Sequence, residues 1–213
     1  MNQKLVIFGN GELAEVAHFY FTHDSNYEVM AFTVDSEYVE EEYFNGLPVI
    51  PFQEVEQEFN PEHYHMHVSV GNSKRNSVRE AKYHQAKQKG YDLASYISSK
   101  LHLWPNHIIG DNCLILEDNT IQPLTTIGNN VIMWSVNHLG HHSSIADHCF
   151  IASHVVISGG VSVGAHSFIG VNATIGDHIT IAERSIIGAG ALILEDTEVD
   201  GVYPAQTTSR SVR

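Results

Sequence analysis

Hydrophobic residues recur at every sixth position through the second half of this 213-residue chain. A fixed short period indicates one structural unit repeated many times, with each apolar side chain buried against those of neighbouring units. Six residues suit a short strand followed by a bend, so the pattern predicts an all-β parallel β-helix. The positions are Ile97, Leu103, Ile109, Ile115, Ile121, Ile127, Met133, Leu139, Ile145, Ile151, Ile157, Val163, Ile169, Ile175, Ile181, Ile187 and Ile193.

The first part of the chain has a different pattern, in which apolar runs alternate with helical spacing. Strands that alternate with helices indicate a small parallel sheet built from Rossmann-like βαβ units. We therefore expect two domains, an α/β domain at 1–95 and a β-helix domain at 96–213. The expected strands are 4–8, 27–34, 47–50 and 65–70. Three helices are expected, one that follows the first strand and ends near residue 21, one at 54–59 and one at 77–89.

Composition narrows the function classes. The formal net charge is −14, with 11 Lys and Arg against 25 Asp and Glu, and this argues against nucleic acid as a partner. No apolar run approaches the roughly 20 residues needed to cross a bilayer, and the first residues lack the pattern of an export signal. We expect a cytoplasmic protein with no membrane partner.

Cys113 and Cys149 both follow an apolar repeat residue by four positions, so we expect them to be buried, about 10 Å apart and not disulfide-bonded.

Seven histidines lie in the middle of the repeat, and the six-residue register separates them into two groups. Five stand three positions after an apolar repeat residue, where the side chain is expected to face outward. A solvent-facing or subunit-contact surface is the favoured interpretation. A metal site is the weaker alternative, because the five spread over several faces and no Cys or carboxylate completes a clear set of metal ligands. These five are His142, His148, His154, His166 and His178.

His138 and His141 depart from that register and lie on either side of a predicted corner. Gly159 follows His141 by 18 residues, which is one full coil if three repeats form each coil, so we expect the two to stack. A neutral imidazole can accept a proton from an attacking amine or hydroxyl. An unshielded Gly159 N–H can stabilise a thioester oxygen as it gains charge. The stack favours acyl transfer, with His141 as the first candidate for the base and His138 as its rival.

The turn after the first expected strand, GNGELA at 9–14, matches G-x-G-x-x-G/A, and Asp35 ends the next strand. Such a turn lets backbone N–H groups and a helix N-terminus approach a phosphate, while the acid can bind a ribose hydroxyl. NAD is one interpretation, disfavoured because the domain is short and no dehydrogenase substrate domain follows. Arg75 can supply positive charge to a diphosphate, and a plain surface role suits it equally well.

The hexads, among them IGNNVI, IGVNAT and IGDHIT, resemble those of the hexapeptide-repeat acyltransferases, whose fold is a left-handed parallel β-helix. With the α/β domain in front, nearly the whole chain resembles the bacterial nucleotide-amino-sugar N-acetyltransferases, a group that includes the sialic-acid O-acetyltransferase-like sugar acyltransferases. The resemblance implies acetyl-CoA as co-substrate, His141 as general base and the Gly159 N–H as the donor to the acetyl carbonyl. It also implies a homotrimer with active sites between neighbouring β-helices.

The same resemblance implies further residues at the two substrate sites. Val171 and Ala189 match positions along the coenzyme A channel. Phe150 stands where the family often has a second histidine near the acetyl group, and His142 stands where an Asp or Glu often follows the base. In the α/β domain the resemblance implies that the turn holds the diphosphate of a nucleotide sugar. The matching positions are Gly11, Glu12, Leu13, Asp35, Ser36, Gly71 and Asn72.

The leading hypothesis is acetyl transfer from acetyl-CoA to the amino group of a nucleotide-linked amino-dideoxy sugar, for surface-polysaccharide (O-antigen) or glycan biosynthesis. The amine would attack the thioester directly, because no cysteine or serine is clearly activated for an acyl-enzyme. O-acetylation of a sugar hydroxyl is a close alternative, since the same base and oxyanion donor serve both reactions. A non-catalytic trimeric scaffold is the alternative from a different class. The sequence leaves the nucleobase, the sugar and the acylated position open.

Overall fold

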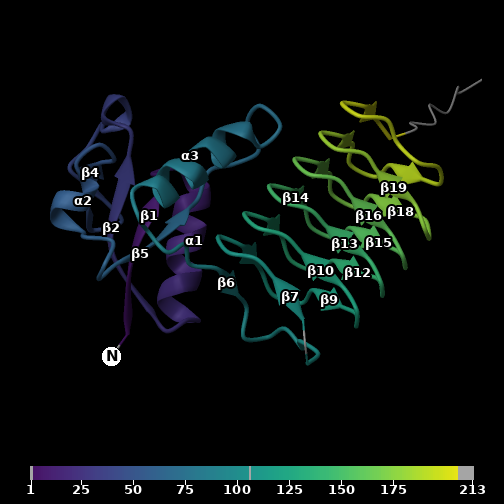
Figure 1. Cartoon of the computed structure of the whole chain (residues 1–213), viewed down its shortest axis with the longest axis horizontal. Helices are drawn as coiled ribbons and strands as arrows, with labels where there is room; N and C mark the ends of the chain where they lie inside the picture. The colour runs from purple at the N-terminus through teal and green to yellow at the C-terminus, as the bar shows by residue number, and fades with distance from the viewer. Residues whose placement is uncertain (1, 106, 206–213) are drawn as a thin grey trace, which may run out of the picture.

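The computed structural model describes residues 2–105 and 107–205, which form an α/β domain beside the first coils of a β-helix (Figure 1). Among these residues, no helix has the length and apolar character that a membrane crossing would require. The elements of the α/β domain are β1 (Gln3–Phe8), α1 (Glu12–His23), β2 (Tyr27–Val34), a 3-10 turn (Ser36–Tyr38), β3 (Tyr43–Phe44), β4 (Leu47–Pro51), α2 (Val55–Glu58), β5 (His65–Val68) and α3 (Ser77–Gln88).

The α/β domain has three layers, a sheet with helices on both faces, because β1 has apolar side chains on each of its two faces. The sheet order is β3-β4-β2-β1-β5. Leu5 and Ile7 pack with α1 on one face, whereas Val6 and Phe8 pack with α2 and α3 on the other, because successive residues of a strand point to opposite faces. The four expected strands pair in parallel, and a further strand that was not expected, β3, pairs with β4 antiparallel at one edge. A two-residue turn, 45–46, joins these two strands, and so short a connection permits only antiparallel pairing.

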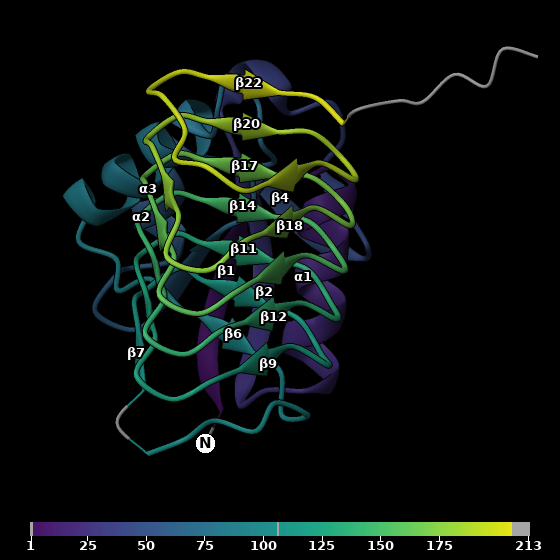
Figure 2. The same cartoon turned by 90° about the vertical axis from the view of Figure 1, so that its right-hand side faces the viewer.

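The second domain is a three-sided prism of two-residue strands, and Figure 2 shows the strands of one face stacked in a column. One face consists of β6 (Tyr96–Ile97), β8 (Leu114–Ile115), β11 (Ile132–Met133), β14 (Phe150–Ile151), β17 (Phe168–Ile169), β20 (Ile186–Ile187) and β22 (Val202–Tyr203). The second consists of β7 (Ile108–Ile109), β10 (Thr126–Ile127), β13 (Ser144–Ile145), β16 (Ser162–Val163) and β19 (Thr180–Ile181). The third consists of β9 (Thr120–Ile121), β12 (His138–Leu139), β15 (Val156–Ile157), β18 (Thr174–Ile175) and β21 (Leu192–Ile193).

The six-residue register places the core as predicted. All strand pairing within the prism is parallel, and partners such as Ile127, Ile145 and Val163 stand one coil of 18 residues apart. The apolar repeat residues from Ile115 to Ile193 are buried in one continuous core, which also holds both cysteines. Stacking is therefore the source of stability, because no single coil buries its own apolar side chains.

From Asn112 to Gly190, the corner position three residues after each apolar repeat residue has a left-handed backbone, with φ of 59° at His142 and 64° at His148. Among residues with a Cβ, Asn, Asp and His adopt this conformation most readily. Backbone geometry thus accounts for five histidines at these corners without any shared chemistry. Three of the five, His142, His154 and His178, are exposed as predicted.

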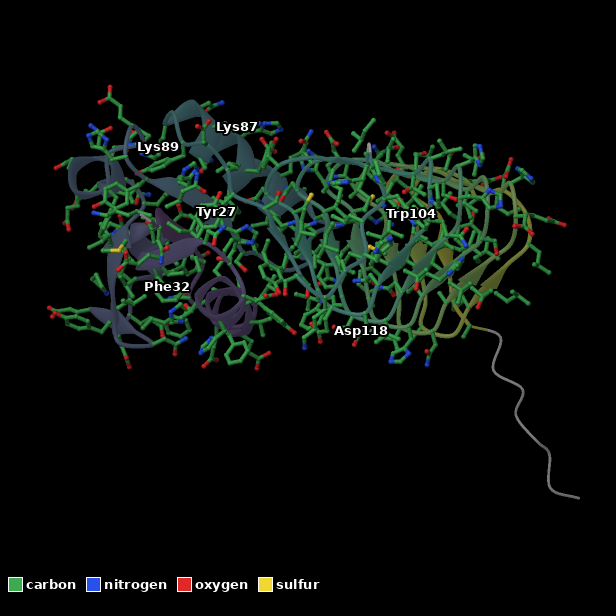
Figure 3. All side chains as sticks on the ribbon, turned by 90° about the horizontal axis from the view of Figure 1, so that it is seen from below. Tyr27, Phe32, Lys87, Lys89, Trp104 and Asp118 are labelled. Carbon is green, nitrogen blue, oxygen red and sulfur yellow. The ribbon has the colours of Figure 1, made fainter. Side chains whose placement is uncertain are left out.

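The two domains share a hydrophobic core along the β6–β22 face. Leu114 and Ile132 precede the inward repeat residues and therefore point outward, where they pack with α1 and the sheet of the α/β domain. On the opposite side of the contact, Lys87 of α3 pairs with Asp111 in the corner before β8. Lys87 lies close to where the domains meet, as the labelled side chain in Figure 3 shows. The outward positions of this face are apolar, whereas Thr and Ser dominate them on the β7–β19 face.

We predict that the folded protein loses stability in mild acid, because two of its histidines are buried. Burial lowers the pKa of both His67 and His148 to about 4, below the ordinary value of about 6.5 that applies once the chain unfolds. Both rings are therefore neutral in the folded protein, and the unfolded chain binds protons first as the pH drops. Stability is complete above about pH 6.5 and declines towards pH 4, by about 1.4 kcal/mol per pH unit for each histidine.

Urea unfolding at about pH 7.5 and about pH 5 measures this decline. The His148→Gln variant should lose about 2 kcal/mol less than the wild type between these two pH values. Equal losses in the two proteins would show that His148 does not contribute.

Candidate active site

A cavity of about 480 Å³ opens at the carboxyl edge of the α/β sheet, where β1, β2 and β5 end. The loop after β1, the loop after β5 and two side chains of α3 form its walls. Ligands of open parallel sheets bind at this edge because the loops there converge. The cavity is lined by Phe8, Gly9, Asn10, Gly11, Glu12, Leu13, Val34, Asp35, Tyr38, Ser69, Val70, Gly71, Val78 and Lys82.

The loop after β1 is shaped to admit an anion. Gly9 has a φ of 128°, and a Cβ there would lie 2.6 Å from the Ser69 carbonyl oxygen, so only glycine fits. Gly11 is the N-cap of α1, and no side chain caps this helix end. The Ala14 N–H donates to the Gly11 carbonyl, whereas the Glu12 and Leu13 N–H groups remain available to a phosphate in the cavity.

Lys82 is a cavity residue that the sequence analysis did not identify. Its Nζ lies 2.7 Å from an Asp35 carboxylate oxygen, and the two side chains are largely shielded from solvent. The same ammonium group lies 5.5 Å from the ring centroid of Phe8. A nucleoside entering the cavity would meet an Asp35–Lys82 ion pair and not an isolated carboxylate. The signal in the sequence is the position of Lys82 on the second turn of a helix that starts beside this edge.

Three of the expected nucleotide-sugar residues do not line the cavity. Ser36 donates its hydroxyl hydrogen to Gln53 at 2.7 Å, and the Asn72 carbonyl accepts the Asn76 N–H. For Arg75 the sequence left a diphosphate contact and a surface role open, and its place outside the cavity favours the second. Its guanidinium donates to the Asp200 side chain and carbonyl near the last coil of the β-helix. The loop before α3 turns towards the β-helix, and that turn carries Arg75 away from the cavity.

Arg79 is a second residue that the sequence analysis missed. It is fully buried, and its guanidinium donates to the carbonyl oxygens of Val70 and Gly71 in the cavity loop. The other side of the guanidinium donates to the backbone carbonyl oxygens of His148 and Cys149 in the β-helix. Burial lowers the pKa of Arg79 to about 10, which leaves it charged at neutral pH. A single cation thus ties the cavity loop to the β-helix.

His141 and Gly159 stack at the corner between the β9–β21 face and the β7–β19 face. The His141 backbone N–H donates to Gln122 Oε1 on the coil below at 2.8 Å. The imidazole lies against Gly159 so closely that a Cβ on Gly159 would be 2.7 Å from its Cε1 and 3.0 Å from its Nε2. Gly159 therefore leaves the space in which the His141 ring lies.

The expectation of an unshielded Gly159 N–H is wrong in this structure. That N–H donates to Oδ1 of Asp177, one coil further along, at 3.0 Å. The same arrangement recurs at another corner, where the Asn129 N–H donates to Asp147. A side chain from the next coil thus satisfies backbone donors at this type of position, and a stack of hexads alone does not reveal such a contact.

The remaining expected residues lie at different places on the prism. His138 projects from β12 on the β9–β21 face, one edge of which carries His141. Val171 and Ala189 are exposed at the other edge of that face, one coil apart. Phe150 lies on the β6–β22 face, stacked on Phe168 and packed against the α/β domain, so within one chain it is remote from His141.

Metal-ligand-type side chains gather where α3 covers a corner of the β-helix. Glu80 Oε1 lies 3.7 Å from Nε2 of both His148 and His166, and 3.9 Å from Nε2 of His84. His148 projects from the β-helix, as expected, but the expectations of a solvent-facing ring and of no carboxylate beside it are wrong, because a helix of the other domain covers His148 and supplies Glu80.

A hydrogen-bond chain determines which nitrogen of His148 carries the proton. The Val68 N–H donates to Asn112 Oδ1, Asn112 Nδ2 donates to Asn130 Oδ1, and Asn130 Nδ2 donates to His148 Nδ1. Because Nδ1 accepts, the neutral ring carries its proton on Nε2, the atom that faces Glu80. A metal ligand needs a lone pair on that atom. We therefore assign this group to the domain interface and not to a metal site.

Comparison with known proteins agrees with both domains. Two family models match, the PglD N-terminal domain over residues 4–86 and the bacterial transferase hexapeptide (six repeats) over residues 160–195. No curated protein matches this chain.

Solved structures match over nearly the whole chain. The acetyltransferase domain of PglB from Neisseria gonorrhoeae FA1090 is 26% identical, with a TM-score of 0.82, over 92% of this chain and 94% of that chain. The same domain in complex with acetyl coenzyme A gives 24% identity and a TM-score of 0.81, over 92% and 93%. A mutant of perosamine N-acetyltransferase from Caulobacter crescentus, in complex with CoA and GDP-perosamine, gives 22% and 0.81, over 91% and 89%.

These matches agree with the predicted order of domains, in which an α/β domain is followed by a left-handed β-helix. Residues 4–86 are thus similar to the PglD N-terminal domain and residues 160–195 to the bacterial transferase hexapeptide, and the predicted resemblance to the hexapeptide-repeat sugar acetyltransferases is confirmed.

Proposed function

We propose that this protein transfers an acetyl group from acetyl-CoA to the amino group of a nucleotide-linked amino-dideoxy sugar. The observation that carries the proposal is the His141 imidazole, held against Gly159 at an exposed corner of the β-helix. The cavity beside the N-terminus of α1 supplies the nucleotide site. The similar structures support both substrates, since one was solved with acetyl coenzyme A and another with CoA and GDP-perosamine.

The reaction needs one base and no acyl-enzyme intermediate. The sugar amine attacks the thioester carbon, and Nε2 of His141 accepts a proton from the amine nitrogen. As the C–S bond breaks, the same proton can pass to the departing thiolate of coenzyme A, so no proton is gained or lost overall. The Gly159 N–H can donate to the thioester oxygen only after that oxygen replaces the Asp177 carboxylate.

We further propose that the active unit is a cytoplasmic homotrimer in surface-glycan synthesis. The α/β domain packs on the β6–β22 face, and His141 lies at the corner between the other two faces. A nucleotide sugar bound in one chain's cavity would therefore reach the His141 of another chain. Exposed apolar side chains on the β9–β21 face, Val156 and Leu192, offer contact surface. Val171 and Ala189 would line the coenzyme A site of such an assembly.

A substrate panel tests the proposal. We expect acetyl-CoA-dependent thiol release with a UDP-, dTDP- or GDP-linked amino sugar, and an acetamide in the product by NMR. Calorimetry with UDP, dTDP and GDP identifies the nucleobase. Acetylation only of sugar hydroxyls would establish the O-acetyltransferase alternative. Binding of neither nucleotide nor coenzyme A would favour the scaffold.

A further inference from the structure

The imidazoles of His141 and His142 form a hydrogen-bonded pair. Their Nδ1 atoms lie 3.0 Å apart, and the rings meet edge to face with centroids 5.2 Å apart. A neutral imidazole has one N–H and one lone pair, so one Nδ1 must donate and the other must accept. The direction of this one hydrogen bond decides which nitrogen of His141 carries a proton.

The corner holds both rings in place from below and above. The His142 N–H donates to the Pro123 carbonyl, and the left-handed backbone of His142 is repeated at this corner in the neighbouring coils, at Leu124 and Gly160. His141 is held by Gln122 beneath it and by Gly159 above. With Nδ1 turned to His142, the His141 Nε2 lies over Gly159, where a reacting amine would have to approach.

Only one of the two hydrogen-bond directions leaves His141 able to act as a base. If His142 donated, His141 would carry its proton on Nε2 and could not accept another there. We propose that His142 is the positioning residue of the site, a neutral acceptor that binds the His141 Nδ1–H and keeps Nε2 unprotonated. This inference rests on the proposed acetyl transfer. When Nε2 takes the amine proton, the resulting imidazolium keeps its hydrogen bond to His142, which is then charge-assisted.

The other titratable groups at this corner belong to the next coil. Asp177 bonds the Gly159 N–H, and the His178 ring lies beside Gly160. These groups stay the same in all variants of His142.

The pH dependence of kcat/KM in three variants tests the assignment. His142→Asn retains an acceptor oxygen and should stay within about tenfold of the wild type. His142→Leu has no acceptor and should lose about ten- to a hundredfold in kcat with little change in KM. His142→Asp places a negative charge beside His141 and should move the acidic limb of the profile up by about one pH unit. Wild-type kcat in His142→Leu, or an unmoved limb in His142→Asp, would overturn the proposal.

A control and a second readout separate this inference from the proposed function. His154→Leu changes an exposed histidine at a corresponding left-handed corner and should leave the pH profile unchanged. Nitrogen-15 NMR of histidine-labelled protein reports the tautomer without any substrate. We expect a protonated Nδ1 on His141 in the wild type and a mixture of tautomers in His142→Leu. A wild-type His141 protonated on Nε2 would contradict the inference even in an active enzyme. The expected tautomer in a protein that acetylates nothing would instead contradict the proposed function.

Discussion

His141→Asn is expected to lower kcat/KM for acetyl transfer by about 10²–10⁴-fold, because the group that accepts the amine proton is removed. Asparagine is smaller than histidine, so it fits against Gly159 without strain. His141 is exposed, and the substitution should leave the urea midpoint unchanged. Thiol release at saturating acetyl-CoA, with the nucleotide sugar varied, measures the loss.

Two further variants serve as comparisons for the His141→Asn result. His138→Asn tests the rival base on the adjacent strand β12, and the larger loss of the two identifies the residue that takes the proton. His154→Asn, at an exposed corner outside the proposed site, should be indistinguishable from the wild type. A near-normal kcat in His141→Asn would remove His141 from the role of base.

Gly159→Ala is expected to lower kcat by about 10²-fold, although it adds only one methyl group. That methyl would lie 2.7 Å from Cε1 of His141, so the imidazole must move away from its position. Displacement of a reacting group by about 1 Å is sufficient for a loss of this size. Gly159 does not have a positive φ, so the backbone itself accepts alanine. Rate measurements alongside urea unfolding separate the displaced ring from a general loss of stability.

A double-mutant cycle tests the cause of that loss. In the His141→Asn background, Gly159→Ala should cost little more, because the displaced ring is already absent. Gly176→Ala is a control one coil further along, at the position before the equivalent of Gly159, where the new methyl would have no contact closer than the end of the Leu194 side chain at 3.3 Å. Full additivity of the two losses would mean that Gly159 acts through something other than the His141 ring.

The local patterns of the sequence predicted the elements closely because each depends on short-range periodicity. The expected strand at 27–34 is β2, and the expected helix at 77–89 is α3, which ends at Gln88. The repeat register placed the core residues and one coil of separation between His141 and Gly159. The strand β3 was missed because two residues are too few to form a recognisable pattern.

The failures concern side chains whose partners come from distant parts of the chain. Asp177 binds the Gly159 N–H, Asp200 binds Arg75, and Glu80 faces His148. None of these contacts follows from a hexad or a turn motif. Lys82 was overlooked for the same reason, since its partner Asp35 stands 47 residues earlier on another element.

The sequence by itself determined the architecture, because a six-residue period admits one way of burying every apolar repeat residue. It also determined where the anion-binding turn and the His141 corner stand along the chain. Only the tertiary structure decided how the domains meet and which polar groups are already paired. Arg79 shows why: it satisfies carbonyl oxygens of both domains at once, so its role exists only after the α/β domain has docked on the β-helix. Hydrogen bonds of this kind depend on positions in space and leave no period in the sequence.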